Sequence, residues 1–322
     1  MASFLIRRLL YSIIVLFVVS FFAFAAVRAT FNPLAKLAAS KDVEVKQRES
    51  ERLGLNRPMV VQYGDFMGKF VQGNWGQSES THEAVSAMIQ RSMVATLQLI
   101  IPGVILSIVA AIGLGVYSAV KQYSAGDYFL TAFSFVGIAL PPFWFGLIAI
   151  EFLAVQPKSW FGLQQTPLYF VGLHSGDGAG VNWDYFRHLI LPVLTLTVQI
   201  IAGWSRFQRA SMLDVLSADY VRTAKAKGVP RKQVIFKHAF RNALVPMVTV
   251  MALDIGALFG GLVITESIFS IPGMGRMFLN ALQNGDAPVL AVWVIVTAGF
   301  VLLFNLFADL TYGLLDPRVR LA

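Results

Sequence analysis

The sequence predicts an all-α integral membrane protein that crosses the bilayer six times. Of its 322 residues, 56% are hydrophobic and only 14% are charged, whereas a soluble domain carries about 25% charged residues. The apolar residues gather in six runs, each near the roughly 20 residues that a helix needs to span a membrane. The chain contains no cysteine, which excludes disulfides, thiolate metal sites and cysteine nucleophiles.

The first apolar run extends from Leu9 to Val27 and follows Arg7 and Arg8. The Ala23-Phe24-Ala25 sequence is similar to a signal-peptidase site, so a cleaved signal sequence is the alternative interpretation. The run is about 19 residues long, which is enough to span and longer than a usual signal core. We therefore favour a retained helix whose N-terminus is cytoplasmic.

Residues 31–92 are polar and are predicted to lie outside the membrane. A run of mixed charge predicts a short helix from Val43 to Leu53, which Gly54 and Pro58 would end. The aromatic and glycine content of Gly73–Ser78 favours some order there. A plain linker is the alternative.

Five further spans are predicted at Met93–Val120, Tyr128–Val155, Leu189–Trp204, Val245–Ile268 and Pro288–Leu310. The second of these contains Pro141 and Pro142, which remove backbone hydrogen bonds and predict a kink. Such a kink is tolerated only where neighbouring helices or a watery cavity satisfy the freed groups. Six spans place both chain ends in the cytoplasm, and the basic residues near each end agree with this orientation.

The longest strongly charged run of the chain, Asp214–Pro246, lies between the fourth and fifth spans. Its basic residues are Arg222, Lys225, Lys227, Arg231, Lys232, Lys237 and Arg241, and only Asp214 and Asp219 oppose them. Basic residues near span ends resist translocation, so this loop is predicted to be cytoplasmic. A solvated loop that only fixes the topology is the alternative to a docking element.

Two short helices are expected within this loop. Ser217 or Asp219 can cap the first, and Gly228 can end it in left-handed geometry. Pro230 suits the first turn of the second helix. One face of that helix would gather Val234, Ile235, His238 and Ala239.

The loop resembles the cytoplasmic loop of ABC-importer permeases, whose motif is E-A-A, three residues, then G. The matching positions here are Arg222, Thr223, Ala224 and Gly228, so the Glu and the first Ala are missing. The sequences D-Y-V-R-T-A-K-A-K-G and H-A-F-R-N-A-L-V-P, with the spacing from Gly228 to Pro246, are similar to the oligopeptide/dipeptide branch. S-R-F-Q-R-A-S-M-L-D-V-L, E-S-I-F-S-I-P-G-M-G-R and L-L-D-P-R extend the resemblance over nearly the whole chain.

This resemblance implies a type I importer permease of the bacterial inner membrane that moves oligopeptides or dipeptides. Its implied partners are a second homologous permease, two cytosolic ABC ATPases and an external peptide-binding protein, besides the lipid bilayer. The implied division is a first helix at 1–30, an external segment at 31–92, a five-helix core at 93–313 with a coupling loop at 206–244, and a tail at 314–322. The implied ATPase-coupling residues are Asp219, Tyr220, Arg222, Thr223, Ala224, Lys225, Gly228 and Pro230. Tyr220 and Ala224 would pack against the ATPase, and Arg222 and Lys225 would make charged contacts.

No enzymatic activity, metal or cofactor is predicted for the chain itself. It lacks the G-x-x-x-x-G-K-[ST] phosphate loop, so ATP and Mg would be bound by the partner subunits. None of its four histidines pairs with another at metal-ligand spacing. The net charge of +8 is explained by topology and anionic lipid, and no nucleic-acid partner is expected.

Three acidic residues fall in or near apolar spans, where an ionised carboxylate costs at least about 2–3 kcal/mol. They are Asp254, Glu266 and Glu151, and we expect them on the translocation pathway. The alternative is a carboxyl group that fixes helix packing, which is equally weighted for Asp254 and favoured for Glu151. Glu266 is expected near the outer surface, as a gate or simply in contact with water.

Gly256 and Gly260 form a small-x-x-x-small pair that lets two helices approach closely, either within the chain or against a second permease. Pro141 and Pro142 are expected to kink a helix that lines the moving core.

Other functions remain open at this stage. Glutathione and nickel chelates are moved by permeases similar to this one. A self-contained secondary transporter would show inverted repeats and several buried charges, and neither is clear here. An intramembrane protease would need a serine motif or paired aspartates within the membrane, and a channel would need a filter-like loop.

Overall fold

The computed structural model describes residues 2–31, 43–52, 54–176 and 180–315. Its regular elements there are helices, with one isolated β-bridge between Gln77 and Ala84. Five helices are long and apolar enough to cross a membrane, and there are six such spans if one bent helix pair is counted as a span. The five are α1 (Ala2–Thr30), α4 (Val85–Val120), α8 (Trp183–Ser217), α11 (Arg241–Leu258) and α14 (Ala287–Leu315). The predicted all-α membrane fold is confirmed, and the six predicted spans correspond to these five helices and the bent pair counted as one span.

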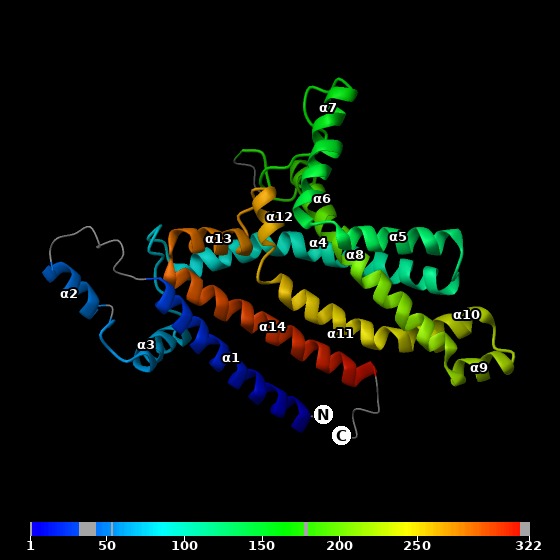
Figure 1. Cartoon of the computed structure of the whole chain (residues 1–322), viewed down its shortest axis with the longest axis horizontal. Coiled ribbons are helices and arrows are strands. Elements are labelled where there is room, and N and C mark those ends of the chain that lie inside the picture. The colour runs from blue at the N-terminus through cyan, green and yellow to red at the C-terminus, as the bar shows by residue number, and fades with distance from the viewer. Residues whose placement is uncertain (1, 32–42, 53, 177–179, 316–322) are drawn as a thin grey trace.

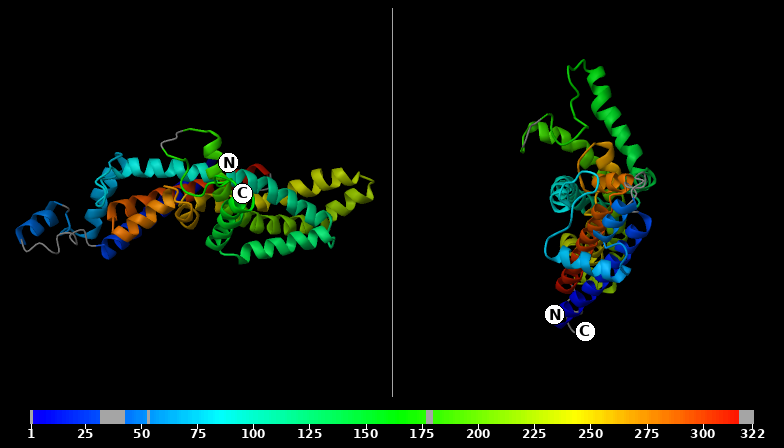
Figure 2. Two further views of the ribbon diagram at one scale, coloured as in Figure 1. Left: turned by 90° about the horizontal axis from the view of Figure 1, so that it is seen from above. Right: turned by 90° about the vertical axis from the view of Figure 1, so that its left-hand side faces the viewer.

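The helices form an elongated bundle (Figure 1). One end carries α9 (Asp219–Ala226), α10 (Arg231–Gln233) and η3 (Val234–Phe240), and we call it the hairpin end. The other end carries α2 (Val43–Arg52), α3 (Met59–Val71) and α13 (Met274–Asn284). Figure 2 shows the same two ends of the bundle from above. Helix α14 packs against both α1 and α11, while α8 packs along α4, α5 (Ala125–Ala139) and α11.

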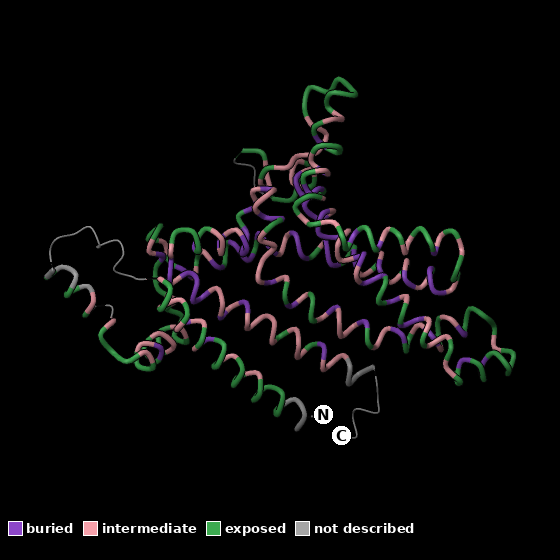
Figure 3. The backbone as a smooth tube through the Cα atoms, viewed as in Figure 1, coloured by how far each residue is buried: buried purple, intermediate pink, exposed green. Residues whose placement is uncertain are grey.

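One core cluster lies where α4 and α8 meet the segment that links α12 (Val263–Ile268) to α13 (Figure 3). Leu99 and Leu191 are fully buried there, as are Phe269 and Ile271. Helix α1 is mostly exposed in the isolated chain, as its apolar, lipid-compatible sequence predicts.

The proline pair breaks the third span instead of kinking it. Helices α5 (Ala125–Ala139) and α6 (Pro142–Ile150) meet at an angle of 104°. The second helix continues through η2 (Glu151–Val155) and α7 (Gln156–Trp160) as an arm that leaves the bundle (Figure 1). Gln199 Nε2 of α8 donates to the Leu140 carbonyl at 3.0 Å. A side chain of a neighbouring helix therefore satisfies a backbone group at the break.

The fifth span also differs from the prediction, because α11 ends at Leu258 and a separate helix α12 (Val263–Ile268) follows. Gly261 between them has φ +96°, and a Cβ there would lie 2.0 Å from the Gly275 nitrogen. The chain therefore turns at Gly261, where its backbone packs directly against the backbone of Gly275. Helix α13, whose first turn contains Gly275, was not predicted.

The helix predicted from Val43 to Leu53 is present as α2, with Leu53 outside the described residues. The structure adds α3, whose Tyr63 packs against aromatic rings of α1 and shares a 2.6 Å hydrogen bond with Ser20. Gly64 and Gly68 within α3 weaken helix propensity, which explains why the sequence pattern does not reveal it.

Asp286, between α13 and α14, anchors the loop that precedes α4. Its carboxylate accepts hydrogen bonds from Ser80 Oγ at 2.7 Å, from Ser78 Oγ, and from the Glu79 amide at 3.1 Å. Burial alone would raise the pKa of Asp286, but these hydrogen bonds outweigh burial and hold the pKa below its ordinary value of 3.8. The segment around Gly73–Ser78 is thus ordered at its C-terminal end.

We expect Asp286→Asn to weaken these contacts. The amide nitrogen of Asn is itself a donor, and it would face donors whose hydrogen bonds the carboxylate now accepts. Hydrogen exchange over residues 77–84 should rise about tenfold at neutral pH. The lowered pKa means that the carboxylate stabilises the fold fully above pH 3.8 and progressively less as the pH falls through the folded-state pKa. Wild-type exchange should therefore approach that of the variant in acid. Glu83→Gln, in an exposed pair with Arg91, is the control and should change little.

Candidate functional site

The basic hairpin, residues 218–240, is built around one glycine. Gly228 adopts φ +75° after α9, its amide donates to the Lys225 carbonyl at 3.0 Å, and the Val229 amide donates to the Ala224 carbonyl at 3.2 Å. This is the predicted left-handed helix end. The predicted cap is wrong: Ala218 holds the N-cap position, and Ser217 Oγ donates instead to the Asp214 carbonyl.

The hairpin has its own small core, in which Val221, Ala224 and Val234 are buried together. Ala224 is 8% exposed, so its expected contact with a partner is corrected: it packs inside the hairpin because it shares a helix face with Val221. The predicted inner face of the second helix is present, with Val234 and Ala239 buried. This core holds the two helices as one body.

The other face of α9 is exposed and basic. The exposed residues of α9 are Asp219, Tyr220, Arg222, Thr223, Lys225 and Ala226, and Lys227 at its C-cap is exposed too. Arg222 lies 3.5 Å from the Asp219 carboxylate, and the Tyr220 hydroxyl accepts from Asn242 Nδ2 at 3.1 Å. Pro230, also exposed, precedes α10. A partner could therefore contact a cationic helix with one oriented tyrosine.

A buried ion pair ties the hairpin end of the bundle together. Arg209 of α8 donates from Nε and Nη2 to the two carboxylate oxygens of Asp127 at 2.8 and 2.9 Å. Ser118 of α4 and the Tyr123 amide also donate to this carboxylate. Asp127 is 2% exposed. Because α8 runs on to Ser217 and then into α9, this bidentate pair links the hairpin rigidly to α4 and α5.

The sequence pattern does not reveal this pair. Arg209 and Asp127 are 82 positions apart in the sequence, so no local spacing brings them together. The one local signal is Ser124 followed three residues later by Asp127, a capping arrangement in which the Asp127 amide donates to Ser124 Oγ at 3.2 Å.

A groove of 570 Å³ lies between α6, α8, α11 and α12. Asp254 lines it and is exposed in the isolated chain, and its Oδ2 accepts from Trp204 Nε1 at 2.7 Å. Thirteen residues separate Asp254 from the start of α11 at Arg241, which corresponds to about 20 Å along the helix. Asp254 also lies four residues, about 6 Å, before the end of α11 at Leu258. An exposed carboxylate within an apolar span is costly to place against lipid, which favours water or another subunit over this groove.

Glu266 does not open into the groove. It is fully buried, and its Oε1 accepts from Thr96 Oγ1 at 2.7 Å while its Oε2 accepts from the Gly275 and Arg276 amides at 2.8 and 2.9 Å. A Cβ on Gly273 would lie 2.4 Å from this carboxyl group. Glu266 is therefore neither solvated nor on a visible path: it caps α13 and joins it to α4.

We expect Glu266→Gln to lower the free energy of unfolding by about 1–3 kcal/mol, because one donor would face the new amide nitrogen. Thermal unfolding in detergent measures this. The matched control is Glu151→Gln, because Glu151 is exposed on η2 and accepts only from Gln156 Nε2 among the hydrogen bonds of the described residues. A loss of transport in Glu266→Gln at unchanged stability would restore the pathway role.

The remaining predicted positions have defined surroundings. Pro142 lines the groove, and Pro141 stands at the N-cap of α6. A Cβ on Gly256 would lie 3.0 Å from Phe304 Cβ and 3.3 Å from Val301 Cα, so Gly256 faces α14 of the same chain. Gly260 lies near Thr297 and Trp293 of the same helix. Among the described residues, no three His, Asp or Glu side chains are placed to hold a metal ion.

Comparison with known proteins gives two family matches and several full-length relatives. Residues 111–321 match the family "Binding-protein-dependent transport system inner membrane component", and residues 1–100 match its N-terminal membrane component family. The oligopeptide transport system permease protein AppB of Bacillus subtilis is 38% identical, over 99% of this chain and 100% of AppB. The di/tripeptide transport system permease protein DppB of Pseudomonas aeruginosa is 36% identical, over 99% of each chain. The oligopeptide transport system permease protein OppB of Mycobacterium tuberculosis is 33% identical over the whole of both chains.

Proposed function

The chain belongs to the family of binding-protein-dependent transport system inner membrane components, and from this premise we propose that it is the transmembrane subunit of an ATP-driven importer of oligopeptides or dipeptides. The relatives that match it over their full length are peptide permeases. Its long apolar helices and its family make it a multi-pass protein of the bacterial inner membrane.

The observation that carries the coupling role is the exposed cationic face of α9. Because Val221 and Ala224 are used inside the hairpin, the face that remains for a partner is the one with Tyr220, Thr223 and the basic residues. We propose that this face docks on a cytosolic ABC ATPase, and that the hairpin end of the bundle is therefore the cytoplasmic end. The basic residues of this end favour the same orientation.

The proposed mechanism is mechanical, since the chain has no phosphate-binding loop of its own. Closure of two ATPases on ATP would move the hairpin. The Asp127–Arg209 pair would transmit this movement to α4, α5 and α8 as one body. A second permease covering the Asp254 groove would complete a pathway whose two halves rock between inward and outward access. ATP and Mg remain on the partner subunits.

Reconstitution in proteoliposomes tests this proposal. We expect labelled peptide uptake only when the chain is combined with the second permease, both ATPases, the external binding protein and ATP. The isolated chain should move no peptide. Uptake by the chain alone would instead identify a secondary transporter. Uptake of glutathione or nickel chelates, but not of peptides, by the full complex would reassign the substrate within the family.

A further inference from the structure

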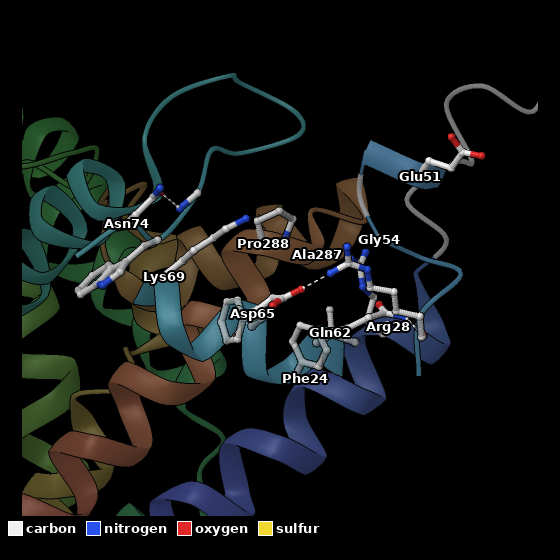
Figure 4. A pocket seen from close by; sticks show the side chains of 16 residues that line it. Phe24, Arg28, Glu51, Gly54, Gln62, Asp65, Lys69, Asn74, Ala287 and Pro288 are labelled. Carbon is white, nitrogen blue, oxygen red and sulfur yellow. Dashed lines mark hydrogen bonds and ion pairs between the residues drawn. The ribbon is translucent and has the colours of Figure 1, made fainter. Parts of the chain in front are cut away.

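Two large cavities of the chain differ in the charges that line them. The cavity between α1, α3 and the start of α14, shown in Figure 4, has a volume of 450 Å³. It is lined by charged residues of both signs: Arg28, Arg57, Lys69, Glu51 and Asp65. The groove between α6, α8, α11 and α12 has a volume of 570 Å³, and Asp254 is the only charged residue among the described residues that line it. The charge of the groove therefore favours a cation, whereas that of the other cavity favours neither sign.

The Asp254 carboxylate is held in place, yet only one of its oxygens is used. Its Oδ2 accepts from Trp204 Nε1 at 2.7 Å, and Trp204 is itself buried, at 3% exposure. Its Oδ1 accepts no hydrogen bond from the described residues, and the Asp254 side chain is exposed in the isolated chain. A molecule in the groove can therefore bond this carboxylate without displacing Trp204.

Three other polar groups of the groove have their donors engaged within the chain. Thr195 Oγ1 donates at 2.9 Å to the carbonyl four residues earlier in α8. Gln199 Nε2 donates to the Leu140 carbonyl at 3.0 Å, and the Trp204 N–H is used by Asp254. Gln199 Oε1, by contrast, accepts no hydrogen bond from the described residues, although it is not enclosed. The groove thus offers acceptors, which suit a ligand group that is rich in donors.

The proposed cargo carries such a group whatever its sequence. The α-ammonium of a peptide has a positive charge and three N–H donors, and it stays the same while the side chains vary. An ammonium group that enters an apolar span loses its water, and a carboxylate placed there offsets this cost. Asp254 lies near the end of α11 that is remote from the hairpin. In the proposed orientation this is the external half of the span, which an arriving peptide reaches first.

We propose that the Asp254 groove is a subsite for the N-terminal end of the transported peptide. Asp254 Oδ1 accepts from the α-ammonium, and Gln199 Oε1 supplies an acceptor for a further N–H of the peptide. The subsite rests on the proposed function, peptide import, and adds a selectivity to it. The permease itself, and not only the external binding protein, then favours cargo with a free N-terminus.

The test compares uptake of a peptide with uptake of its des-amino analogue by the assembled importer in proteoliposomes with ATP. Both are supplied bound to the external binding protein, whose own preference is then the same for every permease variant. We expect Asp254→Asn to lower uptake of the peptide about tenfold and to leave uptake of the analogue unchanged. The Asn amide oxygen can still accept from Trp204, so the fold is kept. Asp254→Glu should retain the preference for the peptide. Asp65→Asn, which removes an exposed carboxylate paired with Arg57 on α3, is the control and should change neither rate.

An equal fall for peptide and analogue in Asp254→Asn would overturn the subsite, since it is the result expected if Asp254 pairs with a basic residue of the second permease. Unchanged uptake of both would overturn it too. If the binding protein does not hold the analogue, covalent capture decides: a carbodiimide joins an amine to a carboxylate as an amide and takes up the water that is lost. We expect the peptide to be captured on Asp254 and its N-acetylated form not to be, and capture on other carboxylates alone would overturn the subsite. Failure of the wild-type complex to import any peptide would instead refute the proposed function.

Discussion

Asp127→Asn is expected to lower the free energy of unfolding by about 3 kcal/mol, because it leaves the Arg209 guanidinium with a neutral neighbour inside the bundle. The estimate lies at the low end for a broken buried pair, since the Arg209 side chain is 26% exposed and water can reach part of it. Thermal unfolding of the purified protein in detergent measures the change.

The same variant, Asp127→Asn, should also uncouple ATP hydrolysis from peptide transport in the assembled importer. Arg209 stands eight residues before the end of α8 at Ser217, about 12 Å from the hairpin. Without the pair, hairpin movement is no longer transmitted as a rigid displacement of α4 and α5. We expect ATP hydrolysis by the assembled complex to continue while peptide uptake falls strongly.

A double-mutant cycle provides the control. Arg209→Gln alone should also destabilise the protein, because it leaves the buried Asp127 carboxylate without its cationic partner. Asp127→Asn with Arg209→Gln should lose less than the sum of the two single variants, since neither charge is then left alone. Additive losses would show that the two residues act independently, and would remove the ion pair from the coupling route.

Gly228→Val is expected to abolish most ATP-driven uptake. Gly228 holds φ +75°, a conformation that costs a β-branched residue about 1–3 kcal/mol. Nothing lies within 4 Å of a Cβ at this position, so the penalty is conformational. The end of α9 would shift, and with it the exposed face that carries Tyr220 and Thr223. Uptake in proteoliposomes and co-purification of the ATPases are the measurements.

Gly228→Asn is the matched control, because asparagine tolerates left-handed geometry far better than valine does. It should keep most of the uptake although it also adds a side chain. Equal loss in both variants would mean that a partner needs the empty space at Gly228 rather than its backbone conformation. Normal uptake in Gly228→Val would refute the docking role of the hairpin.

The sequence predicts those features that depend on hydropathy and local backbone geometry. Hydropathy locates the spans, and Gly228 marks the end of α9 because glycine there adopts the left-handed conformation. For the third span, the two prolines predict that the helix is interrupted, but they do not predict the angle. The 104° angle between α5 and α6 depends on packing against α8 and α12.

Contacts between distant residues are not visible in one sequence. Asp127 and Arg209 are 82 positions apart, and Glu266 and Thr96 are 170 apart. Glu266 illustrates the consequence: its sequence context indicates a charge near the surface, whereas folding surrounds it with hydrogen-bond donors. Ala224 belongs to a recognisable motif, yet only the position of Val234 across the hairpin shows that it faces inward.

The absence of cysteine from the chain permits labelling of single introduced thiols. Thr223→Cys places one on the exposed face of α9, and Gln72→Cys places another after α3 at the opposite end. With an impermeant maleimide, we expect Thr223→Cys to react only from the cytoplasmic side and to be protected when the ATPases are bound, while Gln72→Cys reacts only from the external side. Labelling of Thr223→Cys from outside the cell, or labelling that the ATPases leave unchanged, would contradict the proposal that an ATP-driven partner moves this hairpin.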